Sequence, residues 1–229
     1  MKRNFFWLWI GVAMNVWLSG RASVTGQWDF NSSNLTASVG ASLTYRGDTA
    51  TATIFRPATI GGQSAVVMGF PAATPAQGFV MAHGIAPNGG GSLVNRYTLI
   101  MDVMFPAAST GQWRSLFQTD GANATDGELF VNPANGIGIS SVYAGTIPAD
   151  TWHRVAFVFD LTLGTGRLRK FIDGVFVGGQ DLSAGVDGRW AMNPTALLFT
   201  DENSETRAGF VNSLQVHDLA LPDSYLAAL

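Results

Sequence analysis

The chain has 229 residues, of which 47% are apolar and only 13% are charged. This composition argues against disorder and provides enough apolar side chains for a large hydrophobic core. Its formal net charge is −3, which argues against nucleic acid and anionic membranes as partners, and the absence of cysteine excludes disulfides and thiol chemistry. The 27 glycines and the shortage of Lys and Glu favour short strands joined by tight turns.

The N-terminus has the pattern of a secretory signal peptide. Lys2 and Arg3 precede an apolar stretch at residues 5–18, and Gly20 and Ala22 are small residues placed for cleavage. We predict a signal peptide over residues 1–22 and a single domain over residues 23–229, located outside the cell, at its surface or in the periplasm. A retained membrane anchor is the weaker alternative, because a spanning helix needs roughly 20 apolar residues.

Alternation of apolar and polar residues predicts strands along the first half of the chain. Residues 24–30 alternate clearly, residues 35–56 alternate loosely, and strands are expected at residues 65–70 and 79–83. Residues 97–105 form a nearly continuous apolar run rich in strand-forming side chains, which predicts a central strand.

The second half continues the series of short strands. Asp173-Gly174 lies between two apolar runs and predicts a tight hairpin, because a type I′ turn needs positive φ at both central residues. Pro222 opens a segment that suits one or two helical turns. The regular spacing of about a dozen strands indicates a sandwich or barrel. The remaining strands are expected at residues 113–118, 128–131, 138–142, 152–160, 167–172, 175–177, 196–199 and 209–217.

Three segments carry a family resemblance. Residues 150–160 read DTWHRVAFVFD, residues 168–177 read LRKFIDGVFV, and residues 210–221 close the series with FVNSLQVHDLAL. They resemble the laminin-G-like, concanavalin A-like jelly-roll superfamily, in its secreted bacterial form. The resemblance implies an all-β, antiparallel two-sheet jelly-roll sandwich with a short C-terminal helical turn. It implies little about function, because the superfamily holds lectins, glycosidases and adhesion modules.

The sequence offers no motif for catalysis. A glycosidase needs two carboxylates about 5–5.5 Å or about 6.5–9.5 Å apart, and this superfamily places them on one strand as Glu-x-Asp-x-x-Glu. The only glutamates are Glu128, Glu202 and Glu205, and none of them is in that arrangement. There is also no Gly-x-Ser-x-Gly nucleophile motif. We therefore predict a protein that is not an enzyme.

Two oxygen-rich loops are candidates for calcium. Residues 120–128 and residues 200–205 each follow a predicted strand, and calcium takes six to eight oxygen ligands from flexible loops. The resemblance points the same way, since its members often bind calcium at one rim of the sandwich. If the loops meet, Asp120, Asp126, Asp201 and Glu202 supply the charge. The alternative is that these residues only form turns.

Exposed aromatic rings are candidates for stacking on sugars. Trp190 lies in a loop-like stretch and is expected to be the most exposed tryptophan, and Tyr143 is the second candidate. Asn132, in the turn of residues 132–136, is a third candidate contact with carbohydrate. The strand patterns place the other tryptophans of the predicted domain in the core, namely Trp28, Trp113 and Trp152.

These observations favour a secreted, non-catalytic module that binds carbohydrate or extracellular matrix, with calcium as its possible cofactor. The expected partner is an extracellular polysaccharide or glycoprotein. A structural or protein-interaction domain of a larger surface assembly, without a small ligand, is the alternative, and a glycoside hydrolase comes third. Exposed aromatic residues would favour the first function, and two facing carboxylates in a cleft would favour the third.

Overall fold

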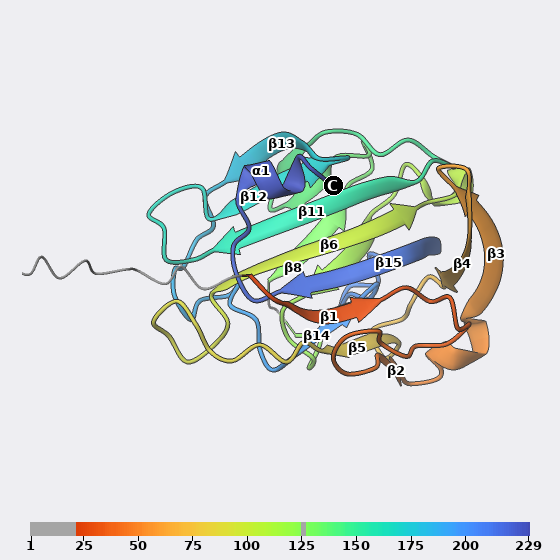
Figure 1. Ribbon diagram of the computed structural model, residues 1–229, viewed down its shortest axis with the longest axis horizontal. Helices are drawn as coiled ribbons and strands as arrows, with labels where there is room; N and C mark the ends of the chain where they lie inside the picture. The colour runs from red at the N-terminus through yellow and green to blue at the C-terminus, as the bar shows by residue number, and fades with distance from the viewer. Residues whose placement is uncertain (1–21, 125–126) are drawn as a thin grey trace, which may run out of the picture.

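The computed structural model describes residues 22–124 and 127–229 of the chain. Two antiparallel β-sheets are stacked face to face (Figure 1). The predicted signal peptide, apart from Ala22, and the candidate ligand Asp126 lie outside the described residues. No helix in the described part of the chain is long and apolar enough to cross a membrane.

The first sheet has eight strands, in the order β13-β12-β11-β6-β15-β4-β3, with β1 also paired to β15. β15 therefore has β6 along one side and both β4 and β1 along the other. The strands are β1 (Val24–Trp28), β3 (Ile54–Ile60), β4 (Gln63–Phe70), β6 (Arg96–Met104), β11 (His153–Asp160), β12 (Leu168–Ile172), β13 (Val175–Gln180) and β15 (Gly209–His217).

The second sheet has seven strands, in the order β10-β9-β8-β7-β14-β5-β2. β7 to β10 are neighbours in sequence as well as in the sheet, whereas β14 pairs with both β5 and β7, which are far from it in sequence. The strands are β2 (Thr44–Arg46), β5 (Gly78–Ala82), β7 (Arg114–Gln118), β8 (Glu128–Val131), β9 (Ile137–Ile139), β10 (Val142–Ala144) and β14 (Thr195–Leu198).

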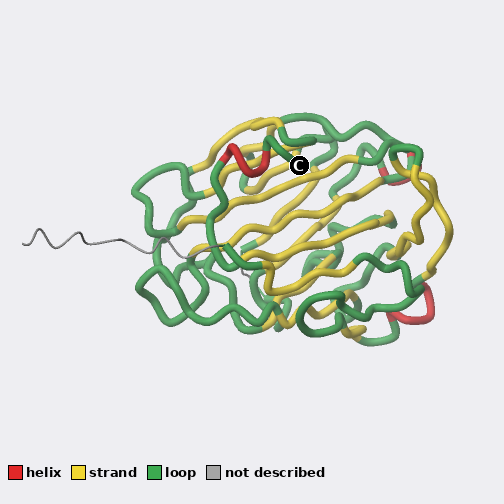
Figure 2. The backbone as a smooth tube through the Cα atoms, viewed as in Figure 1, coloured by secondary structure: helices red, strands yellow, loops and turns green. Residues whose placement is uncertain are grey.

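Helices are few and short, and they lie at the periphery of the sandwich (Figure 2). They are the 3-10 turns η1 (Thr49–Ala52) and η2 (Ala107–Ser109) and the single helical turn α1 (Asp223–Leu226). The predicted all-β antiparallel sandwich with a C-terminal helical turn is confirmed.

The core lies between the two sheets and follows the alternation of the strands. On β11, Val155, Phe157 and Phe159 point into the main core. Ala156 and Val158 point to the opposite face, where the segment around α1 covers them. Successive side chains of a strand point to opposite faces, so one strand serves two apolar layers. The predicted strand at residues 152–160 is confirmed, and it begins at His153.

Backbone turns account for two details of the strand pattern. The predicted strand at residues 138–142 is divided into β9 and β10, because Ser140 and Ser141 both have positive φ and turn the chain. The predicted Asp173-Gly174 hairpin is confirmed, with φ of 50° and 76° at its two residues.

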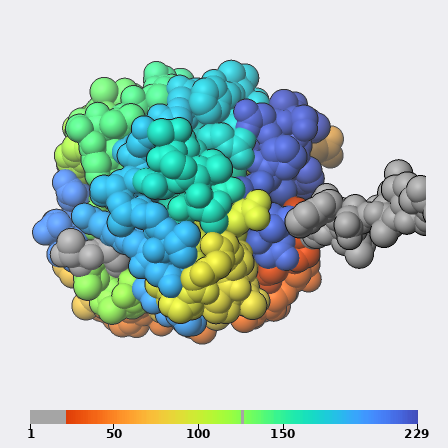
Figure 3. Space-filling view, turned by 90° about the vertical axis from the view of Figure 1, so that its left-hand side faces the viewer, coloured from red at the N-terminus to blue at the C-terminus, as the bar shows by residue number. Residues whose placement is uncertain are grey.

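A carboxylate clamp joins two loops at one end of the sandwich. Asp187 accepts hydrogen bonds from the backbone of Ser92 (2.6 Å) and Leu93 (2.9 Å) and from the side chain of Asn95 (3.0 Å). These donors, with Asn95 first, hold the pKa of Asp187 well below its usual range. Figure 3 shows the two segments side by side in yellow and light blue. The clamp fixes the loop that leads into Arg189 and Trp190.

Candidate functional site

Three neighbouring strands place polar side chains on the outer face of the second sheet. Leu129 and Val131 of β8 enter the core, so Glu128 lies on the opposite face. Gln118 of β7 is paired with Glu128 on one side and with Leu197 of β14 on the other. Directly opposite residues of antiparallel strands share a face, so Gln118 and Glu128 are neighbours on this surface.

The chain after β14 returns over this face. The Thr200 carbonyl accepts hydrogen bonds from the Ser115 hydroxyl (2.6 Å) and from the Gln118 amide (3.0 Å). The next two residues, Asp201 and Glu202, are thereby held above β7.

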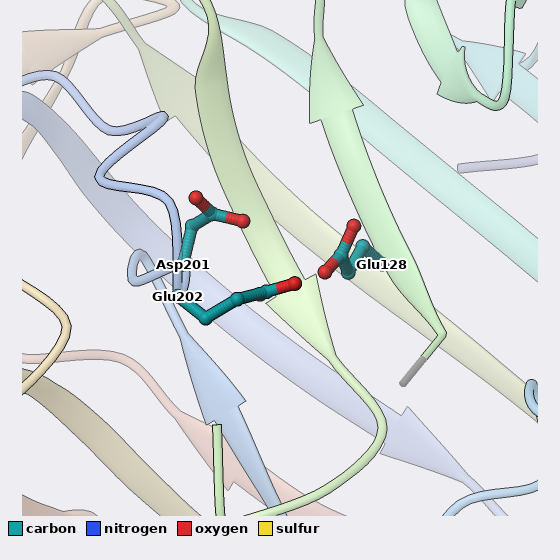
Figure 4. A group of neighbouring side chains, drawn as sticks. All are labelled: Glu128, Asp201 and Glu202. Carbon is teal, nitrogen blue, oxygen red and sulfur yellow. The ribbon is translucent and has the colours of Figure 1, made fainter. Parts of the chain in front are cut away.

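Glu128, Asp201 and Glu202 form a compact carboxylate cluster. Each contributes one oxygen, and these oxygens all lie within 4.8 Å of one another. Figure 4 shows the Glu202 side chain extending toward Glu128. Asp201 is fully buried, and Glu128 is 9% exposed. Three acidic groups in so small and dry a volume repel one another strongly.

Both the repulsion and the burial raise pKa values within the carboxylate cluster. Burial, a hydrogen bond with Glu202 and the charges of Glu202 and Asp201 raise the pKa of Glu128 to about 8. Burial also raises the pKa of Asp201, against the opposing effect of two backbone hydrogen bonds. Arg189, whose Nη2 is 3.9 Å from the Glu128 carboxylate, offsets only part of this at Glu128. Near neutral pH the cluster therefore favours either a proton or a cation.

Unsatisfied oxygens at the cluster show which of its atoms can bind a cation. Among the described residues, the buried Glu128 Oε1 and Asp201 Oδ1 have no hydrogen-bond partner, and neither does Gln118 Oε1. The Gln118 amide lies beside Glu202, since its Nε2 is 3.5 Å from Glu202 Oε2. Ligands on opposite sides of a calcium ion are about 5 Å apart, twice the usual Ca–O distance. The three carboxylates lie within this span and can hold a metal ion.

Of the four residues predicted as metal ligands, three lie in the described part of the chain, and the structure brings two of them together. Asp201 and Glu202 lie together. Asp120 is not in the cluster, and its Oδ1 instead accepts a hydrogen bond from the backbone of Ala122 (2.9 Å) in a turn. Glu128, which the sequence argument placed in the loop but did not select, is the third member. The sequence could have indicated this, because Glu128 is the first residue of a strand and the next residue, Leu129, faces the core.

The prediction that Trp190 is exposed is wrong. Trp190 is 3% exposed and belongs to the main core, where its backbone carbonyl accepts a hydrogen bond from the Tyr97 hydroxyl at 2.9 Å. The loop carrying it is clamped inward by Asp187. Trp28 is buried as predicted, whereas Trp113 and Trp152 are partly exposed, because each lies just before its strand begins.

Trp113 borders an open groove of about 370 Å³. Tyr143 packs against Trp113, with ring centroids 5.3 Å apart, and stiffens this aromatic wall. The groove also has charged and polar walls, since Arg207 hydrogen-bonds to Gln112 beside it. Its lining residues are Gly111, Gln112, Trp113, Pro133, Ser204, Glu205 and Arg207.

The other two predicted carbohydrate contacts lie near this groove. Asn132 precedes the lining residue Pro133, and its side-chain oxygen accepts a hydrogen bond from Gly136 (2.8 Å) to form the turn. Tyr143 is partly buried, and burial, followed by the charges of Glu205 and Glu128, raises its pKa to about 12. Tyr143 is therefore close to both the groove and the carboxylate cluster.

A second groove, of about 310 Å³, lies on the first sheet. Trp152 lines it together with Arg154 and Asp102, which form a two-point ion pair at 2.6 and 2.8 Å. The polar groups here are already paired with one another. The second groove provides a matched comparison for the groove beside Trp113.

Gly127 sets how closely Glu128 approaches the buried tryptophan. A Cβ atom at Gly127 would lie 2.6 Å from the Trp190 ring and 2.7 Å from the Arg189 carbonyl. We expect Gly127→Ala to destabilise the fold by about 1–3 kcal/mol, the usual cost of overpacking. Chemical denaturation measures this loss, and Gly164→Ala, at an open position, is the control. Equal stability of the two variants would contradict the close packing.

Solved structures share this arrangement of two sheets. One is domain 4 of AbnA, a GH43 extracellular arabinanase from Geobacillus stearothermophilus, in complex with arabinotriose. It has a TM-score of 0.58 and 19% identity over 90% of this chain and 98% of that one. The fold is a concanavalin A-like jelly roll. The same jelly roll occurs in receptor-binding domains of botulinum neurotoxin type G, with TM-scores of 0.58 and 0.60 and identities of 11% and 10%.

The match to the neurotoxin domains covers 90% of this chain but only 50% of theirs. No protein-family model and no curated protein sequence matches the chain. At these identities the likeness establishes the jelly-roll fold, and function has to be argued from the site.

Proposed function

We propose that this chain is a secreted, non-catalytic module that binds carbohydrate in the groove beside Trp113. The observation that supports this proposal is the combination of a partly exposed indole ring with polar and charged walls from Gln112, Glu205 and Arg207. An aromatic face packs on the apolar face of a sugar ring, and neighbouring polar groups hydrogen-bond to its hydroxyls. The expected partner is an extracellular polysaccharide or a glycoprotein.

The arabinanase domain supports the choice of a test ligand. It has the same fold and was solved with arabinotriose, and 98% of it is covered by the match. We therefore use arabinotriose as the first probe and a panel of plant and bacterial polysaccharides as the second.

We propose that the carboxylate cluster holds a calcium ion. Glu128, Asp201 and Glu202 would supply the charged oxygens, and the Gln118 amide N–H groups would orient Glu202. Calcium prefers such oxygen ligands and tolerates irregular geometry. It would neutralise part of the charge that raises the pKa of Glu128.

The cluster also brings two glutamates face to face, which is the arrangement that a glycosidase requires. Two observations favour the non-catalytic reading. Glu128 and Asp201 are almost wholly buried, and the groove beside Trp113 is lined by Glu205 but by none of the three clustered carboxylates. A substrate in this groove would not contact them.

We propose further that residues 23–229 act as one domain outside a bacterial cell, after removal of residues 1–22. Neither nucleic acid nor insertion into a membrane is an expected partner, because the domain is acidic. The alternative function is docking within a larger surface assembly. Val175 and Phe176, which are 64% and 50% exposed on one hairpin, favour that alternative.

Replacing Trp113 tests the proposed function. We expect Trp113→Ala to weaken binding of arabinotriose or the best polysaccharide at least about tenfold, or about 1.4 kcal/mol. Isothermal titration calorimetry measures this change, and Trp152→Ala is the matched control because it alters the other groove. Equal affinities of wild type and Trp113→Ala would overturn the proposal. Retention of no sugar on the panel would favour the docking function.

A further inference from the structure

One short segment, residues 200–207, belongs to both the cation cluster and the groove. Its first half carries Asp201 and Glu202, and its second half provides Ser204, Glu205 and Arg207 to the groove wall. Glu202 and Ser204 are only two positions apart. Any displacement of the carboxylates is therefore transmitted over one or two peptide units to the wall.

The Asp201 carboxylate makes this connection stiff. Its Oδ2 accepts hydrogen bonds from the backbone N–H groups of Asn203 (2.7 Å) and Glu205 (2.9 Å). The Glu205 carbonyl in turn accepts a hydrogen bond from Ser115 on β7 (2.9 Å). One oxygen of a fully buried carboxylate thus holds the backbone of the groove wall, while the other, Oδ1, has no partner in the part of the chain that the structure describes.

We propose that cation binding at Asp201 and ligand binding in the Trp113 groove are positively coupled through residues 200–207. This inference rests on the proposed carbohydrate-binding function. A cation on the free oxygen of Asp201 removes the repulsion among the three carboxylates and holds the wall in its binding position. Without the cation, the repulsion favours conformations in which Asp201 or Glu202 moves away and takes the wall with it.

The coupling is reciprocal, because a cation that strengthens sugar binding must itself be bound more tightly when the sugar is present. The unpartnered oxygens give the cation site a basis beyond the presence of acidic residues. Glu128 Oε1 and Asp201 Oδ1 are buried inside the cluster and have no hydrogen-bond partner among the described residues.

Calorimetry with arabinotriose, or the best polysaccharide of the panel, in calcium chloride and in EDTA tests the coupling. We expect the affinity of the wild type to fall at least about fivefold in EDTA, the lower end of typical coupling. Glu128→Gln and Glu202→Gln should bind equally in both solutions, whereas Asp120→Asn, outside the cluster, should behave as the wild type. Equal wild-type affinity in calcium and EDTA would overturn the coupling while leaving the carbohydrate-binding function intact.

A second measurement needs no sugar. Acrylamide quenching of Trp113, taken as the difference between wild type and Trp113→Phe, reports the exposure of the groove wall. We expect calcium to change this quenching in the wild type and not in Glu128→Gln. A calcium effect on Trp113 without any sugar binding would refute the proposed function alone. If calcium raises the melting temperature but leaves Trp113 unchanged, or has no effect on either, the coupling is refuted.

Discussion

Trp190→Ala should lower the free energy of unfolding by about 3–5 kcal/mol, the typical cost of removing a buried aromatic side chain. Trp190 is 3% exposed, and its ring packs against the backbone at Gly127. The indole N–H has no hydrogen-bond partner among the described residues, which favours the lower half of this range. For a chain of this length, a loss of about 3–4 kcal/mol lowers the melting temperature by about 6–16 °C. Thermal and urea denaturation measure both quantities.

Trp113→Ala is the comparison for this prediction. Trp113 is partly exposed and packs only along one side, against Phe130 and Tyr143, so its removal should cost no more than about 1–2 kcal/mol. The two variants should therefore separate stability from binding. If Trp190→Ala is as stable as the wild type but binds sugar more weakly, Trp190 contacts carbohydrate, as the sequence predicted, and is not a core residue.

Calcium-free protein should lose stability as the pH rises from about 5 to about 8. The reason is Glu128, whose pKa rises from 4.5 in the unfolded chain to about 8 in the fold. Between these values the folded chain binds a proton that the unfolded chain has lost, so the free energy of unfolding falls with increasing pH. The slope approaches about 1.4 kcal/mol per pH unit for one full proton. Below pH 4.5 this contribution is fully present.

Saturating calcium should abolish this trend, because the ion displaces the proton from the carboxylate and the folded chain then has no proton to lose there. The affinity for calcium should rise by up to about tenfold per pH unit below pH 8. Burial lowers the pKa values of His83 and His217, which gives an opposite slope at acidic pH. The difference between wild type and Glu128→Gln cancels the histidines. If that difference is independent of pH in EDTA, Glu128 ionises normally and the account of the cluster is wrong.

The strands could be predicted from sequence because their signal is local. The alternation in residues 152–160 is visible without knowing any partner strand, and both faces of β11 follow it. The meeting of Glu128 with Glu202 depends instead on two registers, β8 against β7 and β14 against β7. No single segment encodes these registers, so the sequence could indicate two acidic loops but not which carboxylates meet.

The tryptophans show a different limit. The strand patterns predict that Trp113 and Trp152 face the core, but in the structure each residue lies just before its strand. The in-and-out alternation of side chains applies only within a strand, so it does not determine where these two rings point. Trp190 lies in an irregular segment and was expected at the surface. Its burial follows from the Asp187 clamp and from the close approach of Gly127, two long-range contacts. Irregular chain can therefore contribute to the core when its polar backbone finds partners.

The position of β15 has a consequence for the order of folding. This strand follows the other strands in sequence, yet it joins β6 to β4 and β1, so the first sheet stays in three parts until residues 209–217 are in place. Partial chains emerging from a ribosome or a translocation pore cannot complete the sandwich. Folding must then occur in one late, cooperative step dominated by contacts between distant residues, which makes it slow. A deletion of only these nine residues should prevent the sandwich from folding, although they are a small part of the chain.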